Sequence, residues 1–111
     1  MVALHADVTR RAQAAAAALA DQGTLRAAYV FGSHAEGRAD CWSDIDVALF
    51  MDEVRDWDFW RRARIITDIQ KLLGFDLELH LFPASALTRP EPASFAAYVI
   101  RHGIPIPIPE R

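Results

Sequence analysis

The sequence predicts a small α/β domain of the α+β type, in which helices pack mainly on one face of a small mixed β-sheet. Three observations predict this class. Segments with strand-like apolar patterns alternate with segments of helical periodicity, the chain has 111 residues, and 52% of them are hydrophobic. We therefore expect one domain over residues 1–111, with residues 104–111 as a proline-rich C-terminal tail.

Three helices are expected from the spacing of apolar residues. The first follows a cap at Asp7 or Thr9 and runs to about residue 21 through an alanine block, which has high helix propensity. The second covers about 56–73, where large apolar residues recur at helical spacing with arginines between them. The third covers about 91–101 and ends before a glycine.

The strands are expected between these helices. Residues 25–31 end in β-forming residues, and the turn-rich segment 32–43 that follows is predicted to be a loop. Residues 44–51 begin with strict alternation and then become apolar throughout, whereas residues 75–82 alternate along their length. The repeated Ile-Pro of residues 104–109 excludes a central strand, because proline lacks a ladder donor, and leaves an edge segment or an extended arm.

Charge and cysteine content exclude several classes of function. The chain has 12 basic and 15 acidic residues, a net charge of −3, whereas a protein that grips nucleic acid non-specifically is usually basic. We expect no direct nucleic-acid binding. The single Cys41 allows neither an intrachain disulfide nor a cysteine-based zinc site. No signal peptide or apolar run of about 20 residues is found, so we expect a cytoplasmic protein without membrane contact.

The most informative pattern is Gly32-Ser33, followed after ten residues by Asp44-Ile45-Asp46. Side chains of a strand alternate with period two, so the two aspartates project from one face about 6–7 Å apart. Paired carboxylates repel each other unless a cation lies between them. Mg²⁺ prefers one or two carboxylates together with substrate phosphates, so the pair predicts a site for a metal–triphosphate complex.

Two further features fit such a site. Gly32 after a strand lets the backbone approach a phosphate closely, and consecutive N–H groups with the Ser33 hydroxyl can hold phosphate oxygens. A third acid is expected from residues 75–82, to complete a metal site or to accept a proton from the attacking hydroxyl. We prefer Glu78, which lies further inside the strand, with Asp76 as second choice.

At this point the sequence resembles a known family. The ordered pattern of Gly-Ser, ten residues and Asp-x-Asp, followed by a helix and an acid-bearing strand, is similar to the minimal nucleotidyltransferases (MNT) of the DNA polymerase β superfamily. The resemblance covers about residues 29–82 and, more loosely, the end of the third helix at residues 101–104. It implies the nucleotidyltransferase fold.

The resemblance also implies roles for individual residues. Gly32 and Ser33 would bind the β- and γ-phosphates of the nucleotide. Asp44 and Asp46 would be catalytic and would bind the metal, as one or two Mg²⁺ ions. Glu78 would be the third catalytic and metal-binding carboxylate.

Family members of this size imply a reaction and a partner. A hydroxyl would attack the α-phosphate of ATP and release pyrophosphate, so that AMP is transferred. Small members are commonly antitoxins that adenylylate a tyrosine of a HEPN-domain toxin, which makes the expected activity that of a protein adenylyltransferase. The partner or a homo-oligomer would supply the rest of the site. Transfer to a small molecule such as an aminoglycoside, and a purely structural subunit, are alternatives.

The loop departs from the family pattern. Many relatives carry arginines after Gly-Ser, whereas this chain has His34 and Glu36, with Arg38 only after Gly37. Fewer positive charges weaken triphosphate binding, and an inward Glu36 would repel it. These residues favour a second interpretation, a catalytically weak or inactive antitoxin that masks its toxin by stoichiometric binding. On the polar face shared with Glu78, His80 is interpreted either as a substrate contact or as a structural or surface histidine.

Overall fold

A four-stranded mixed sheet organises the chain in the computed structural model, which describes residues 3–109. Its strands are β1 (Leu25–Phe31), β2 (Ile45–Met51), β3 (Leu77–Pro83) and β4 (Ile104–Ile106). They lie in the order β3-β2-β1-β4; β2 and β3 are parallel, and β1 is antiparallel to both of its neighbours. The predicted mixed sheet is therefore confirmed.

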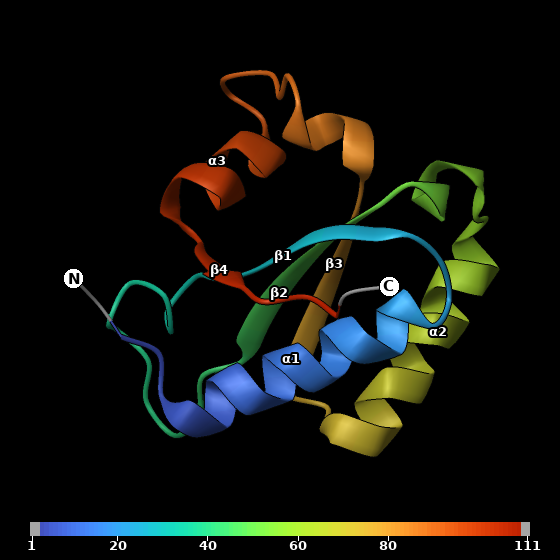
Figure 1. The fold of residues 1–111 in the computed structure, drawn as a ribbon. Coiled ribbons are helices and arrows are strands. Elements are labelled where there is room, and N and C mark those ends of the chain that lie inside the picture. Colours follow the sequence, from blue (N-terminus) through green and yellow to red (C-terminus); the bar gives the residue numbers. More distant parts are fainter. Residues whose placement is uncertain (1–2, 110–111) are drawn as a thin grey trace.

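Helices cover the sheet unequally (Figure 1). They are α1 (Ala6–Ala20), α2 (Phe59–Leu73) and α3 (Phe95–His102), with short 3-10 helices at Glu53–Asp56 and Ala84–Leu87. Apolar side chains of α1 and α2 form one core with one face of the sheet, and those of α3 form a smaller core with the other face. The prediction that helices lie mainly on one face is confirmed, and α3 is the exception.

Helix capping sets boundaries that differ from the expected ones. The cap of α1 is His5, whose Nδ1 accepts from the Asp7 N–H at 3.2 Å, in place of Asp7 or Thr9. The start of α2 lies three residues later than expected. Asp58, whose backbone is extended, is the N-cap, and its side chain accepts from the Arg61 N–H at 2.8 Å.

The beginning of α3 and the beginning of β3 also shift. Ser94 accepts from the N–H of the third helical residue at 3.1 Å, so α3 begins at 95 and not at about 91. The first strand residue after α2 is Leu77, not residue 75, because Gly74 has a positive φ of 125° and the chain turns there. Asp76 therefore lies in a turn, which matters for the site below.

The proline-rich tail forms an edge strand over its first three residues. Ile104 pairs with Val30 and Ile106 pairs with Ala28, beside β1. Pro105 sits between them in this outermost strand, where a missing N–H costs no ladder bond to a further strand. Of the two alternatives left open by the sequence, the edge segment is confirmed for residues 104–106.

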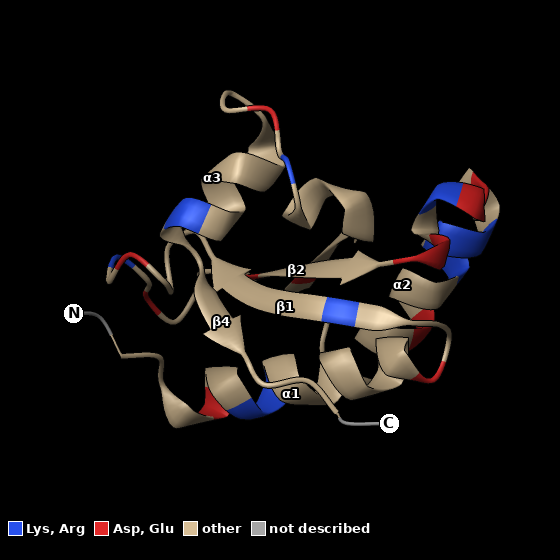
Figure 2. Cartoon of the chain, turned by 45° about the horizontal axis from the view of Figure 1, so that its top comes forward, with Lys and Arg blue, Asp and Glu red and all other residues tan. Residues whose placement is uncertain are grey.

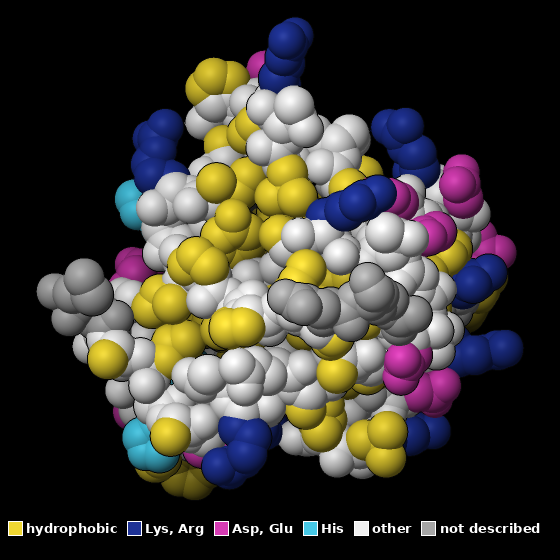
Figure 3. Space-filling view, viewed as in Figure 1, with side chains coloured by type: hydrophobic (Ala, Val, Ile, Leu, Met, Phe, Trp, Pro, Cys, Tyr) yellow, Lys and Arg dark blue, Asp and Glu magenta, His cyan; other side chains and the backbone are white. Residues whose placement is uncertain are grey.

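The sheet interior is apolar at every position of β2 except Asp46, which is half-buried. Charged residues lie mainly on the helices and loops (Figure 2), and hydrophobic side chains gather over α3 and beside β4 in the space-filling view (Figure 3). No helix within residues 3–109 combines the length and the apolar character needed to cross a membrane.

The smaller core provides a test of the packing. Phe50 is fully buried, stacks on Phe82 with ring centroids 5.0 Å apart and meets Tyr29 edge to face at 5.9 Å. We expect Phe50→Ala to lower the free energy of unfolding by about 3–5 kcal/mol through the cavity it leaves. Phe59→Ala, at a side chain that is 70% exposed, should cost less than about 1 kcal/mol. Urea unfolding followed by circular dichroism measures both; equal losses would contradict the assignment of Phe50 to a core.

Candidate active site

The first part of the site is the contact between the end of β1 and the beginning of β2. Phe31 is the register partner of Asp46, so the segment after β1 starts beside this acid. Gly32 has a φ of 75°, and a Cβ on it would lie 2.6 Å from Asp46 Oδ2. Both the left-handed backbone and the close approach require glycine here. Gly32 of the first motif and Asp46 of the second therefore meet, as expected if the two strands are neighbours.

The segment after Gly32 forms one helical turn with free donors at its start. The Glu36 N–H donates to the Gly32 carbonyl at 3.0 Å, and the Arg38 N–H donates to the Ser33 carbonyl at 2.9 Å. Within residues 3–109, the backbone N–H groups of Ser33 and His34 donate to no protein acceptor. Such unpaired N–H groups at the start of a turn are suited to binding an anion.

Three carboxylates gather beside this turn. Asp46 and Glu78 are register partners on the parallel strands β2 and β3, and Asp44 precedes β2 by one residue. Desolvation by neighbouring atoms, the adjacent Glu78 carboxylate and the negative charge of Asp76 together raise the pKa of Asp44. Among residues 3–109, no Lys or Arg forms an ion pair with Asp44, Asp46 or Glu78. The cluster thus concentrates negative charge that no lysine or arginine of the described residues compensates.

His80 completes this cluster. Its Nε2 lies 3.2 Å from Asp46 Oδ1 and 3.9 Å from Glu78 Oε2. One ligand atom each from Asp46, Glu78 and His80 lie within 4.8 Å of one another. Carboxylate oxygens in this arrangement fit a hard divalent cation, and the imidazole nitrogen is a further potential ligand. The sequence alone suggested a substrate contact or a structural or surface histidine, and did not indicate His80 as a member of the acid cluster; its alternation with Glu78 was the available signal.

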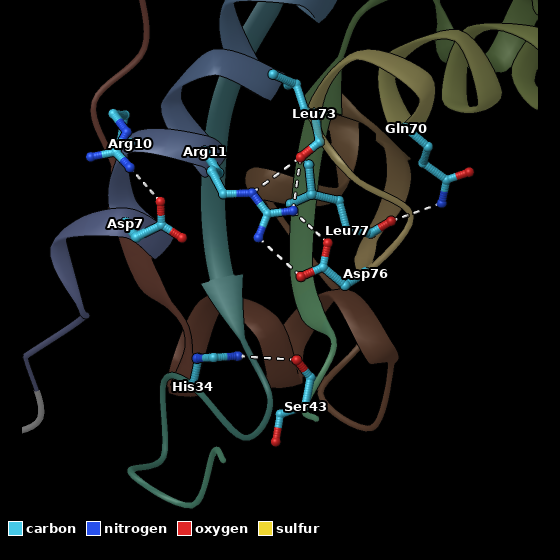
Figure 4. Close-up of polar contacts among 9 residues, drawn as sticks. All are labelled: Asp7, Arg10, Arg11, His34, Ser43, Gln70, Leu73, Asp76 and Leu77. Carbon is cyan, nitrogen blue, oxygen red and sulfur yellow. Dashed lines mark hydrogen bonds and ion pairs between the residues drawn. The ribbon is translucent and has the colours of Figure 1, made fainter. Parts of the chain in front are cut away.

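Asp76 belongs to a different arrangement (Figure 4). The Arg11 guanidinium of α1 forms an ion pair with Asp76 and donates to the Leu73 carbonyl at the end of α2, at 2.8 and 3.1 Å. This guanidinium lowers the pKa of Asp76. Since Asp76 lies in the turn before β3, it does not follow the strand alternation that directs Glu78 to the cluster. The structure thus brings Glu78, and not Asp76, together with Asp46.

Comparison with known proteins agrees with this geometry. The sequence model of the family described as Polymerase beta, Nucleotidyltransferase matches residues 13–106. The chain belongs to this family. A solved structure of a toxin–antitoxin with AMP-PNP contains a chain that is 23% identical, with a TM-score of 0.59 over 84% of this chain and 69% of that chain. This likeness shows the nucleotidyltransferase fold. A search of curated proteins finds none that matches.

In this nucleotidyltransferase the unusual loop residues have partners within the chain. Glu36 Oε2 accepts from the Tyr98 hydroxyl at 2.6 Å, and Glu36 Oε1 accepts from Arg38 at 3.3 Å. The tyrosine hydrogen bond, followed by that of Arg38, lowers the pKa of Glu36. His34 Nε2 lies 3.5 Å from the Ser43 carbonyl. Glu36 is thereby held against α3, and the inward, repelling orientation considered from the sequence is not observed.

Helix α3 brings residues to the site that the sequence did not indicate. Phe95 and Tyr98 are partly exposed, and the Phe95 ring lies 5.6 Å from that of His80. Their helical spacing resembles that of any amphipathic helix, so no sequence signal distinguishes them from core residues.

The ion pair of Asp76 makes a pH-dependent prediction. A lowered folded-state pKa stabilises the protein above the unfolded value of about 4, and this stability is lost as the pH falls through the folded pKa. Since the Asp76 side chain is 47% exposed, we expect Asp76→Asn to cost below about 1 kcal/mol at pH 7. At acidic pH, where the Asp76 carboxylate is protonated, the free energies of unfolding of the variant and of wild type should become equal.

Urea unfolding at pH 7 and at acidic pH measures this difference. Asp68→Asn is the matched control, because Asp68 on α2 forms no ion pair among the described residues. A difference that is the same at all pH values would show that the charge of Asp76 is not its cause.

Proposed function

We propose that this nucleotidyltransferase transfers AMP from ATP to a hydroxyl of a partner protein, with Mg²⁺ bound at the acid cluster. The observation that carries the proposal is the cluster of Asp46, Glu78 and His80, whose ligand atoms lie within 4.8 Å of one another, beside Gly32. Carboxylates and free backbone donors are thus close enough to engage the same metal-bound triphosphate.

The acid cluster fits a divalent cation on its own chemistry. Desolvation, followed by the repulsion of Glu78, raises the pKa of Asp44, and a bound cation would relieve that repulsion. Asp44 and Asp46 would hold Mg²⁺, with Glu78 as a third ligand. The bound metal would neutralise charge on the triphosphate and align it for attack.

The turn after β1 would bind the far end of the triphosphate. The N–H groups of Ser33 and His34, together with the Ser33 hydroxyl, offer hydrogen bonds to the β- and γ-phosphate oxygens. Because Gly32 packs against Asp46, this phosphate site and the acids are held in fixed relation. Such preorganisation is the main source of catalysis in phosphoryl-type transfers.

The proposed chemistry is one displacement. The oxygen of the acceptor hydroxyl attacks the α-phosphorus, a new P–O bond forms, and the bond to the bridging oxygen of the β-phosphate breaks, so that pyrophosphate leaves. Glu78 takes the proton of the attacking hydroxyl. It is half exposed, at 50% of its side chain, and this openness admits an acceptor carried by another protein.

We further propose that the acceptor is a tyrosine of a HEPN-type toxin, with this chain as the antitoxin. The resemblance to the minimal nucleotidyltransferases supports this, as does the fold shared with a chain of the toxin–antitoxin structure with AMP-PNP. Trp42, 88% exposed in the loop before Asp44, offers an aromatic contact for a partner at the rim of the site. A second copy of this chain, in a homo-oligomer, is the other candidate to supply the rest of the site.

The first experiment measures transfer directly. A candidate HEPN-type partner is incubated with this protein, ATP and Mg²⁺, and its intact mass is recorded. We expect a gain of one or more AMP groups, which is lost with EDTA and in the Asp44→Asn/Asp46→Asn variant. Glu78→Gln should lower the rate by about 10²-fold or more, since it cannot accept the proton.

Asp68→Asn, on the opposite layer of the molecule, is the control that should keep wild-type transfer. The masking alternative predicts a different result: no mass gain, a stable complex, and equal protection by wild type and by the Asp44→Asn/Asp46→Asn variant. That outcome would replace catalysis by stoichiometric binding as the function.

A further inference from the structure

The first turn of α3 places an aromatic ring beside the acid cluster. Phe95 meets Phe31, His80 and Phe82 edge to face, with centroid distances of 5.3, 5.6 and 5.7 Å. These contacts fix the ring over the sheet, yet 49% of the residue is exposed. Phe95 thus presents an apolar surface to solvent, and its orientation is fixed by these ring contacts. The imidazole of His80 lies between this ring and Asp46.

Tyr98 extends this surface and ties it to the phosphate-binding turn. Its ring is nearly parallel to that of Phe95, at 26° with centroids 6.5 Å apart. Its hydroxyl donates to Glu36 at 2.6 Å. Glu36 in turn belongs to the helical turn that begins at Gly32. The aromatic surface and the turn are therefore connected by a direct hydrogen bond.

The partly exposed ring of Phe95, close to the acid cluster, is suited to contact a planar ligand. If the α-phosphate lies at the acids and the β- and γ-phosphates lie at the turn, the nucleoside is attached beside the acids, on the sheet face that carries His80. Phe95 is two successive contacts from Asp46, through His80 at 5.6 Å and then 3.2 Å. Aromatic rings bind nucleic-acid bases by stacking, which every base permits through its π-face.

We propose that Phe95 is a stacking platform for the base of the nucleoside triphosphate, and that it favours purines over pyrimidines. This inference rests on the proposed function, because it assumes a triphosphate at the acid cluster. The preference follows from area: a two-ring base covers more of an apolar ring than a one-ring base does. Tyr98 is a positioning residue, which holds α3 against the turn through Glu36.

Calorimetric titration of the full chain in the presence of Mg²⁺ tests the platform. The ligands are ATP, UTP and inorganic tripolyphosphate, which has phosphates but no base. Phe95→Leu keeps apolar bulk against Phe31 and Phe82 and removes the aromatic face; Phe59→Leu, at an exposed site on the opposite layer, is the matched control.

We expect wild type to bind ATP more tightly than UTP. In Phe95→Leu the Kd for ATP should rise about 10-fold, the typical scale of one stacked base, with a smaller rise for UTP. The Kd for tripolyphosphate should stay within about twofold, because no base is involved. Phe95→Tyr should restore wild-type affinity for ATP, and Phe59→Leu should leave all three constants unchanged.

Two results would overturn the platform while the proposed function stands. One is an unchanged Kd for ATP in Phe95→Leu, when tripolyphosphate binding still requires Asp44 and Asp46. The other is an equal loss for ATP and for tripolyphosphate, which would place Phe95 in support of the phosphate site. Binding of neither ligand to wild type would overturn the proposed function itself, and the platform with it.

Discussion

The contact between Gly32 and the Asp46 carboxylate is the constraint on which the site depends. A side chain at position 32 would come within 2.6 Å of Asp46 Oδ2, so the backbone itself forms one wall of the acid cluster. Antiparallel pairing of β1 with β2 sets this distance, because Phe31 and Asp46 are register partners. Free N–H donors and carboxylates can then face one ligand without help from flexible side chains.

Two groups of acids at this end of the sheet show how environment separates structural from chemical roles. Asp76 has a guanidinium partner, Arg11, which also satisfies a carbonyl at the end of α2 and so joins α1 to α2. Asp44 and Glu78 have no lysine or arginine partner among the described residues, and desolvation, followed by the neighbouring Glu78, raises the pKa of Asp44. Charge that the protein leaves unpaired in this way is available to a metal.

The third helix accounts for how the chain accommodates its unusual loop. In a site for a triphosphate, an acidic residue four positions after Gly32 is unfavourable if it faces the ligand. Tyr98 and Arg38 instead hold the carboxylate of Glu36 to the side. The same helix carries Phe95 over the sheet. One element thereby fixes the turn after β1 and flanks the acids, on the sheet face that α1 and α2 leave uncovered.

Local rules in the sequence determined much of this protein: period-two alternation placed Glu78 and His80 on one face of β3, and proline confined residues 104–106 to the sheet edge. Helix starts were less predictable, because several residues can cap and only the folded backbone selects one. Tertiary structure alone decided between Glu78 and Asp76, since the partner of Asp76 lies 65 residues away in the chain. It also decided the surroundings of Phe95, because contacts between distant elements leave no local periodic signal.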